Sequence, residues 1–555
     1  MLKENKGNKF IRLFDYLHEH IIVIIIVVVV LAGAISIIFI LRDKDTKQDD
    51  QQTNMQYEDA DTVYFAMDHL ASLNPLSSED SDTYYISQLL FSSLFRLDGN
   101  LNVEGDLVSD YETDAEAGKV DLTLREGVKF SDGSSLTATD VYYTVNQIWS
   151  IGKKSPYYQY VSKIKSVNVS GSRSLSITFE SPQDAALDNL VFPIVSASDY
   201  DRDADKVLGS GPYRYKSYNS KKYLRLEPNT NYYGTKAENQ LEFNVIKDKN
   251  AVTGLMTMDA VTAYVSRSQN ADVDAEDKGL NVTALNSAET EFLGFNFNNT
   301  HLKKKEFRQA VAKAIDTQAL IDENFGGSAI TSDSIYFPGF LGTENQGDPY
   351  PEDQKGAADL FKACGYKDTN EDGILEDENG KNVTLTLLVN SGNSGRVDCA
   401  VSIKNALEKV GIEVTVKQEA WDEYKKAVED GDFQMYLGGY QFDKKYDLRT
   451  LFSSAAKNGF DSDKIQSKVK QLETCLSAEG QKEVFSELES LLKDELPFYS
   501  ICNKTYSFIT VSHFESQGTP TYFDVFRGCG NWNWQKTLEI KDEKETESEE
   551  TSAEE

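Results

Sequence analysis

Helices and strands alternate along residues 402–443, and this alternation constrains the fold more than any other feature of the chain. The apolar pattern runs helix, strand, helix, strand, and Gly411 follows the first helix as a C-cap residue does. A helix between two strands returns the chain to the same end of the sheet, so the strands lie parallel. The sequence therefore predicts an α/β fold in which helices pack on a largely parallel sheet.

The composition is that of a large globular protein with an acidic surface. At 555 residues the chain can form two or three cores, and its 40% hydrophobic fraction excludes a largely disordered protein. Its 57 basic and 90 acidic residues give a formal net charge of −33 at pH 7. Nucleic-acid binding depends on neutralising phosphates, so no nucleic acid is expected as a partner. The acidity favours solubility outside a cell, with attraction of cationic ligands as the alternative.

Motifs for catalysis and for tightly bound metals are absent from the sequence. There is no His-Glu-x-x-His, no Gly-x-Ser-x-Gly and no Walker A loop. The five cysteines are scattered without a Cys-x-x-Cys pair, and the five histidines form no cluster. We therefore expect a protein that binds rather than catalyses, with no catalytic residue, no cofactor and no metal ligand. The cysteines are expected to be buried thiols.

Residues Ile21–Leu41 are apolar throughout, apart from one serine. A helix of this length spans roughly 31 Å, enough for the hydrocarbon core of a bilayer. We predict a transmembrane anchor here, preceded by a cytoplasmic N-terminus (1–20) and followed by a flexible polar tether (42–61). Four basic residues before the span and three after it indicate the orientation only weakly. The acidic segment 538–555 is predicted to be a disordered tail.

An acidic turn in the second half of the chain resembles the start of an EF-hand loop. Asp368, Asn370 and Asp372 stand at its first, third and fifth positions, and Gly373 permits the sharp bend. The twelfth position is Asn379 in place of the usual glutamate, and no helical pattern enters and leaves the loop properly. We interpret the segment as a solvated turn, with calcium binding as the alternative.

A strand, a turn and a helix are predicted in succession after residue 120. Polar and apolar residues alternate over 121–124, and an Asp-Gly turn signal follows at 132–133. Thr139 or Asp140 is then expected to cap a helix that starts near Val141. By itself this succession fits any α/β domain.

The run LREGVKFSDG at 124–133 resembles a signature of the family 5 extracellular solute-binding proteins, which serve oligopeptide, dipeptide and nickel ABC transporters. Other segments resemble the same family, in the family's order, from Thr62 to about Trp534. They are the opening strand and helix at 72–98, the Gly-x-Gly-Pro-Tyr hairpin at 209–234, the strand and helix at 292–299 and 307–316, the helix at 355–368 and the segment 402–443.

The resemblance implies a two-lobed α/β fold of the periplasmic-binding-protein type, with an extra domain inserted in the N-terminal lobe. The chain would cross between the lobes near residues 285–291 and return near residue 496. Two crossings form a hinge, and closure on a ligand is the implied motion. The N-terminal lobe would comprise 62–98, 206–288 and 497–537, the inserted subdomain 99–205, and the C-terminal lobe 289–496.

The resemblance also bears on the location of the protein. Lipoproteins of this family carry Leu-Ala-Gly-Cys in such an apolar run, and the cysteine is lipidated. Here Ala34 follows Leu31-Ala32-Gly33, so lipidation at this position is chemically impossible. We expect an uncleaved, single-pass protein of the cell membrane with its large domain on the extracytoplasmic face.

The segment GGYQFDKKYDL at 438–448 resembles the strand with which peptide-binding members of the family hold their ligand. Gly439, Tyr440, Gln441 and Asp443 occupy the matching places. The resemblance implies that the backbone of this strand forms hydrogen bonds with the backbone of a peptide. Such bonds do not depend on the side chains of the peptide. Asp443 would receive the α-ammonium group of the peptide through a charge-assisted hydrogen bond.

Three further residues match positions that face the ligand in the family. Trp421 corresponds to an aromatic residue of the pocket, and Glu79 and Ser81 lie in the opening loop, on the other lobe. Tyr440 and Trp421 could instead be core residues, and Asp443 could be a surface turn residue.

The predicted function is the capture of an oligopeptide or another small solute and its delivery to an ABC permease with ATPase subunits. Lys444 and Lys445 follow Asp443 and could favour an acidic ligand instead. Another cargo, such as a sugar, an opine-like compound or a metal chelate, is the first alternative. The second alternative is an anchored receptor that senses its ligand without importing it.

Overall fold

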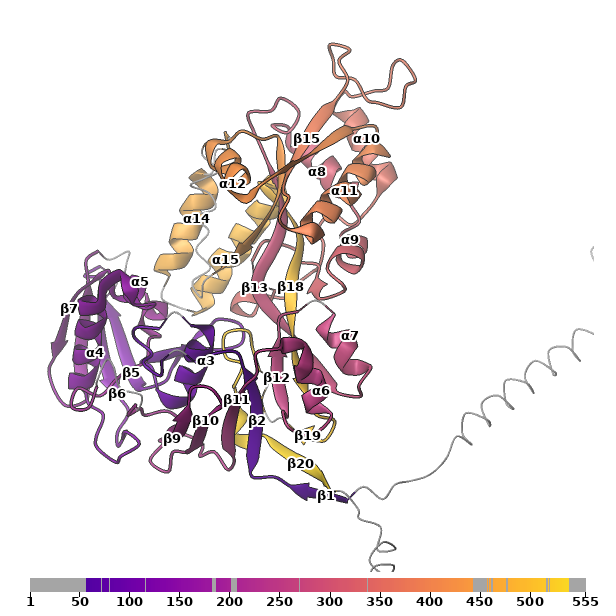
Figure 1. Ribbon diagram of the computed structural model, residues 1–555. Helices are drawn as coiled ribbons and strands as arrows, with labels where there is room; N and C mark the ends of the chain where they lie inside the picture. The colour runs from indigo at the N-terminus through magenta and orange to yellow at the C-terminus, as the bar shows by residue number, and fades with distance from the viewer. Residues whose placement is uncertain are drawn as a thin grey trace, which may run out of the picture. The chain divides into compact units, whose positions relative to one another are not determined.

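The computed structural model (Figure 1) describes residues 56–538 except for 71, 79, 115, 182–185, 201–206, 269, 337, 443–456, 458, 461–462, 476–477, 516–517 and 519. Residues 59–536 form the larger of two compact units. The predicted anchor and most of the predicted tether and tail lie outside the described residues. Within the described residues, no helix is long and apolar enough to span a bilayer.

A mixed sheet of eleven strands runs through the described part of the larger unit. Its order is β16-β15-β17-β13-β18-β12-β2-β11-β10-β9, and β14 pairs with β18 outside this path. The strands are β2 (Thr62–Met67), β9 (Tyr213–Asn219), β10 (Tyr223–Pro228), β11 (Gln240–Val245), β12 (Ala263–Ser266), β13 (Asn281–Phe295), β14 (Ala329–Ile330), β15 (Thr384–Asn390), β16 (Glu413–Glu419), β17 (Met435–Gln441) and β18 (Phe498–Thr510).

The two longest strands of this sheet, β13 and β18, lie antiparallel at its centre (Figure 1). The first part of β13 pairs with the second part of β18, from Asn281 opposite Thr510 to Asn286 opposite Thr505. The register then shifts before Thr290, within the segment where the sequence predicts a crossing between lobes. Beyond the shift, β13 also pairs with β17.

The alternation predicted for residues 402–443 is confirmed. Helix α11 (Ser394–Glu408) joins β15 to β16, and helix α12 (Trp421–Asp430) joins β16 to β17. Strand β15 lies parallel to both β16 and β17. Gly411 follows α11 with a φ of 86°, a left-handed conformation that favours glycine.

A separate antiparallel sheet is formed by residues that lie, along the sequence, between β2 and β9 of the large sheet. Its order is β5-β6-β8-β7, and helix α4 (Ala138–Ile151) belongs to the same region (Figure 1). Side chains of β6 alternate between buried and partly exposed, as the sequence predicts. The strands are β5 (Val108–Asp114), β6 (Lys119–Leu124), β7 (Ile164–Val169) and β8 (Ser174–Phe179).

The start predicted for helix α4 is wrong by three residues. The helix begins at Ala138, and its N-cap is Thr137 rather than Thr139 or Asp140. The Asp140 carboxylate accepts a hydrogen bond from the backbone N–H of Thr137 at 2.8 Å, which completes a capping box. The acidic residue therefore stabilises the helix from its third position, three residues after the cap.

Helices flank the large sheet, and their apolar sides join its core. Ala310 and Val311 of α8 are fully buried, for example. The other helices are α3 (Ser81–Leu90), α5 (Tyr158–Val161), α6 (Val252–Met256), α7 (Ala271–Glu276), α8 (Lys305–Lys313), α9 (Thr317–Asn324), α10 (Gln354–Ala363), α14 (Asp463–Thr474) and α15 (Ala478–Glu495). Short strands complete the described fold: β1 (Gln56–Asp59), β3 (Phe95–Leu97), β4 (Val103–Gly105), β19 (Phe514–Glu515) and β20 (Asn533–Leu538).

The five cysteines are free thiols in this structure. Cys399, Cys502 and Cys529 are buried, as predicted, whereas Cys364 and Cys475 are partly exposed. Burial raises the pKa of the Cys502 thiol well above its usual value, because the thiolate would lose its solvation. The buried cysteines therefore act as small apolar core residues.

The glycines of the Gly-x-Gly-Pro-Tyr hairpin allow the close approach of two backbone segments. A Cβ atom on Gly209 would lie 1.8 Å from the carbonyl oxygen of Leu90, at the end of α3. We expect Gly209→Ala to lower the free energy of unfolding by about 1–3 kcal/mol, because the backbone of one segment must move. Urea denaturation followed by circular dichroism measures this change.

Gly254 supplies the matched control for this substitution. It lies in helix α6 and is not in the left-handed region, and a Cβ at this position would meet no atom within 4 Å outside its own helix. Gly254→Ala should leave stability unchanged or raise it by up to about 1 kcal/mol, because alanine favours a helix. Equal effects of the two substitutions would contradict the proposed close approach.

Candidate functional site

Strand β17 contains three of the predicted ligand-binding residues. On one edge it pairs with β13, so that Gly439 lies opposite Glu291, and Gln441 lies opposite Glu289. On its other edge, β15 pairs only with Met435 and Tyr436 in the described part of the chain. The backbone of Gly438 and Gly439 therefore lies beyond the end of the β15 ladder, at an edge where an extended chain could pair.

The end of β17 contacts a segment that the sequence assigns to the other lobe. The side-chain amide of Gln441 donates a hydrogen bond to the hydroxyl of Tyr522 at 2.8 Å. The hydroxyl of Tyr85, in helix α3, donates to the backbone carbonyl of Tyr522 at 2.8 Å. Tyr522 thus connects the predicted peptide-binding strand to the helix that begins at Ser81.

A cavity of about 410 Å³ lies at the N-terminal end of helix α3. Its walls include Met67 at the carboxyl end of β2 and Arg267 just after β12, and these two strands are parallel. Ligands of open α/β sheets bind outside the carboxyl ends of the strands, and this volume suits a small molecule. The lining residues are Phe65, Ala66, Met67, Asp68, His69, Asp80, Ser81, Asp82, Tyr85, Ile86, Phe243, Lys249, Tyr264, Val265, Arg267, Ser268, Val525 and Phe526.

Helix α3 presents acidic groups to this cavity. Asp80 is the N-cap residue, and its carboxylate accepts a hydrogen bond from the backbone N–H of Asp82 at 2.8 Å. The Asp82 carboxylate accepts in turn from the backbone N–H groups of Asp68 and His69, at 3.0 and 3.4 Å. Burial raises the pKa of Asp82 above its usual value, despite these hydrogen bonds.

Basic groups of the cavity already have acidic or aromatic partners. Lys249 forms an exposed ion pair with Asp68 at 3.1 Å. The guanidinium group of Arg267 lies 5.3 Å from the centre of the Tyr506 ring and 3.4 Å from the Tyr85 hydroxyl. The cavity therefore combines both signs of charge with aromatic surface.

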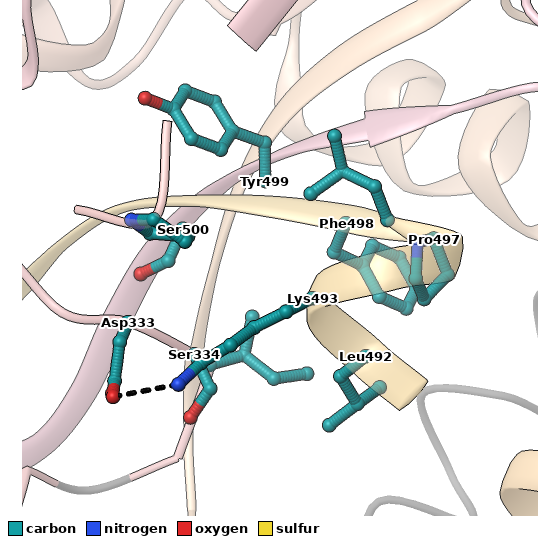
Figure 2. A pocket seen from close by; sticks show the side chains of 11 residues that line it. Asp333, Ser334, Leu492, Lys493, Pro497, Phe498, Tyr499 and Ser500 are labelled. Atoms are coloured by element: carbon teal, nitrogen blue, oxygen red, sulfur yellow. Dashed lines mark hydrogen bonds and ion pairs between the residues drawn. The ribbon is translucent and has the colours of Figure 1, made fainter. Parts of the chain in front are cut away.

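A second cavity, shown in Figure 2, is too small to hold a solute. Its volume is about 20 Å³, room for about one water molecule. Lys493 of α15 forms an ion pair with Asp333 there, at 2.9 Å (Figure 2). This ion pair connects α15 to the loop after β14 and therefore stabilises the fold.

A buried cluster of charged residues lies directly behind Gly439. Arg396 donates two hydrogen bonds to the Glu291 carboxylate, at 2.6 and 2.9 Å, and Lys504 lies 2.9 Å from the same carboxylate. The Glu291 side chain is only 2% exposed. A Cβ on Gly439 would lie 2.0 Å from the Arg396 guanidinium group, so a larger residue at this position would displace the Arg396 side chain. The Tyr506 hydroxyl donates a hydrogen bond to the Glu289 carboxylate, which also lies 3.7 Å from Lys504 and so belongs to the same cluster.

The remaining predicted site residues have different outcomes. Trp421 is 54% exposed at the start of α12 and stacks on Tyr424 with ring centres 5.8 Å apart, so it is not a core residue. Tyr440 is half-buried, and its ring contacts that of Phe442 at 4.7 Å. Ser81 lines the large cavity. Asp443 and Glu79 lie outside the described residues.

Comparison with known proteins decides the family. The family model of the bacterial extracellular solute-binding proteins, family 5 (Middle), matches residues 102–460, which is more than half of the chain. The chain belongs to this family. Its sequence is 27% identical to the oligopeptide-binding protein AppA of Bacillus subtilis over 416 residues, which cover 70% of this chain and 75% of AppA. It is 23% identical to the glutathione-binding protein GsiB of Salmonella typhimurium over 318 residues, or 56% of this chain and 62% of GsiB.

Solved structures share the fold of this family 5 protein. The unliganded open form of the periplasmic murein tripeptide binding protein MppA matches with a TM-score of 0.74 and 17% identity, over 87% of this chain and 99% of MppA. A nickel ABC transporter protein of Bacillus halodurans matches with a TM-score of 0.74 and 16% identity, over 85% of this chain and 100% of that chain. The mixed α/β fold of the periplasmic-binding-protein type is thereby confirmed.

Proposed function

We propose that this family 5 protein is the membrane-anchored, extracytoplasmic substrate-binding component of an ABC importer and captures oligopeptides between two lobes. The observation that carries the proposal is the edge of β17 at Gly438 and Gly439, which extends beyond the β15 ladder. An extended peptide can add to such an edge through backbone hydrogen bonds. AppA, the relative with 27% identity, is an oligopeptide-binding protein.

Each predicted site residue has a role in this proposal. Gly439, Tyr440 and Gln441 present their backbone to the peptide, and Gln441 is held by its bond to Tyr522. Asp443 receives the α-ammonium group of the peptide. Trp421 supplies aromatic surface on one lobe, and Ser81 and Glu79 face the ligand from the other lobe.

The proposed domain organisation follows the sequence boundaries. The N-terminal lobe comprises 62–98, 206–288 and 497–537, and the C-terminal lobe comprises 289–496. The separate sheet of β5–β8 supports an inserted subdomain at 99–205. The proposed hinge lies where the chain crosses between the lobes, within β13 and just before β18. A permease with its ATPase subunits receives the cargo.

A non-peptide cargo is the second candidate, because one structural neighbour is a nickel transporter protein. Nickel prefers imidazole ligands. Among the described residues that line the large cavity, His69 is the one histidine, which is a poor set for the bare ion. A metal chelate, a sugar or an opine-like compound would bind through the charged and aromatic groups instead. An anchored sensor would bind its ligand in the same way but would deliver nothing to a permease.

Calorimetry on the full-length protein tests the proposed cargo. We expect tri- to nonapeptides of mixed sequence to bind, and N-acetylated forms of the same peptides to bind more weakly because they lack the α-ammonium group. Glutathione and a nickel–histidine complex serve as competing cargo. Binding of the chelate together with no binding of any peptide would contradict the proposal.

A further inference from the structure

The acidic turn between α10 and β15 contains three carboxylates that converge. One carboxylate oxygen from each of Asp368, Asp372 and Glu376 lies within 4.8 Å of the others. Calcium binds oxygen at about 2.3–2.6 Å, so ligands on opposite sides of one ion lie up to about 5 Å apart. The three oxygens therefore already have the spacing of ligands around a single calcium ion.

Glu376 provides an independent sign of a missing partner. This residue is 3% exposed, although it lies in an otherwise exposed turn. Its Oε2 accepts hydrogen bonds from the backbone N–H and the hydroxyl of Thr369, at 2.7 and 2.9 Å. Its Oε1 is buried and accepts no hydrogen bond from any residue that the structure describes. A buried carboxylate oxygen without a donor is costly unless a cation binds it.

The rest of the turn has the shape that a calcium loop requires. The backbone N–H of Gly373 donates to Asp368 at 3.0 Å, which folds the loop back on its first residue. Gly373 has a φ of 88°, a conformation that favours glycine. The side-chain oxygen of Asn370 accepts from the backbone N–H of Asp372 at 2.9 Å, and its amide group donates to the Asp372 carboxylate at 3.1 Å. These contacts arrange oxygen ligands at the first, third and fifth positions.

We propose that this loop binds a calcium ion through the carboxylates of Asp368, Asp372 and Glu376. The side-chain oxygen of Asn370 and a backbone carbonyl would complete the coordination, as in loops of this type. Glu376, the ninth residue of the loop, takes the place of the missing glutamate at the twelfth position. The ion joins the exposed turn to a buried side chain and thereby fixes the turn on the C-terminal half of the fold.

Titration of calcium into the EDTA-treated full-length protein tests this site by calorimetry. We expect one site with a dissociation constant of about 10⁻⁵–10⁻³ M, the range from sensor loops to extracellular modules. Magnesium should bind at least about tenfold more weakly, because it requires a smaller, octahedral set of ligands. Calcium should also raise the thermal midpoint of unfolding, since it binds only the folded loop.

Single substitutions separate this site from general attraction of cations to an acidic protein. Asp372→Asn and Asp368→Asn, both at exposed positions, should weaken calcium binding at least about tenfold, and Glu376→Gln should do the same if it folds. Glu371→Gln removes the same charge from the same loop at a residue outside the converging group, and should change affinity less than about twofold. No calcium binding at millimolar concentration, or equal losses in Glu371→Gln and Asp372→Asn, would overturn the proposal.

Discussion

Glu291→Ala should lower the free energy of unfolding by about 3–5 kcal/mol, the cost of removing one partner from a buried ion pair. The substitution leaves the Arg396 guanidinium group, whose side chain is 14% exposed, without the carboxylate that accepts two of its hydrogen bonds. It also removes the closer of the two carboxylates that pair with Lys504. Chemical denaturation of the full-length protein, monitored by tryptophan fluorescence, measures the change.

A pair on the surface of the fold gives the matched control. Arg96 and Glu104 form an ion pair at 3.3 Å between β3 and β4, with side chains 58% and 41% exposed. Glu104→Ala should cost no more than about 1 kcal/mol, because water solvates the remaining charge. If Glu291→Ala costs as little as Glu104→Ala, the cluster behind Gly439 does not hold the strands together.

The second large effect concerns ligand affinity. Asp443→Ala should weaken binding of an oligopeptide by about 2–5 kcal/mol, which is about thirtyfold to a few thousandfold, if the carboxylate pairs with the α-ammonium group away from water. Isothermal titration calorimetry with one peptide in free and N-acetylated form measures this effect. The variant and the unaltered protein should bind the acetylated peptide equally, because this peptide has no ammonium group with which Asp443 could pair.

Comparison of the two proteins with the two peptides also identifies the group that Asp443 contacts. Equal affinity of both proteins for the free peptide would remove Asp443 from the site. Equal weakening for free and acetylated peptides would assign Asp443 a structural role, perturbing the strand rather than binding the ammonium group.

Local patterns were sufficient for much of the fold. The helices and strands of residues 402–443 follow from the spacing of apolar residues and from Gly411, and the structure has them in that order. The cap of α4 was misplaced because Thr137, Thr139 and Asp140 are all good cap residues. Only the pairing of Thr137 with Asp140, three residues later, distinguishes the true start of the helix.

The interior of the candidate site could not be predicted, because its residues are far apart in the sequence. Glu291 and Arg396 are separated by 105 positions, and Gln441 and Tyr522 by 81. A carboxylate within the apolar run of β13 is a sign of a buried partner, but no local pattern identifies that partner. The same holds for Glu376, whose burial appears only when the turn is folded.

Native mass spectrometry of the full-length protein, purified without added ligand, tests the central claim most directly. The proposal predicts an additional mass that is released on collisional activation and that fragments as one or more peptides. A released mass that yields no peptide fragments, such as a sugar or a metal chelate, would contradict oligopeptide capture by this protein.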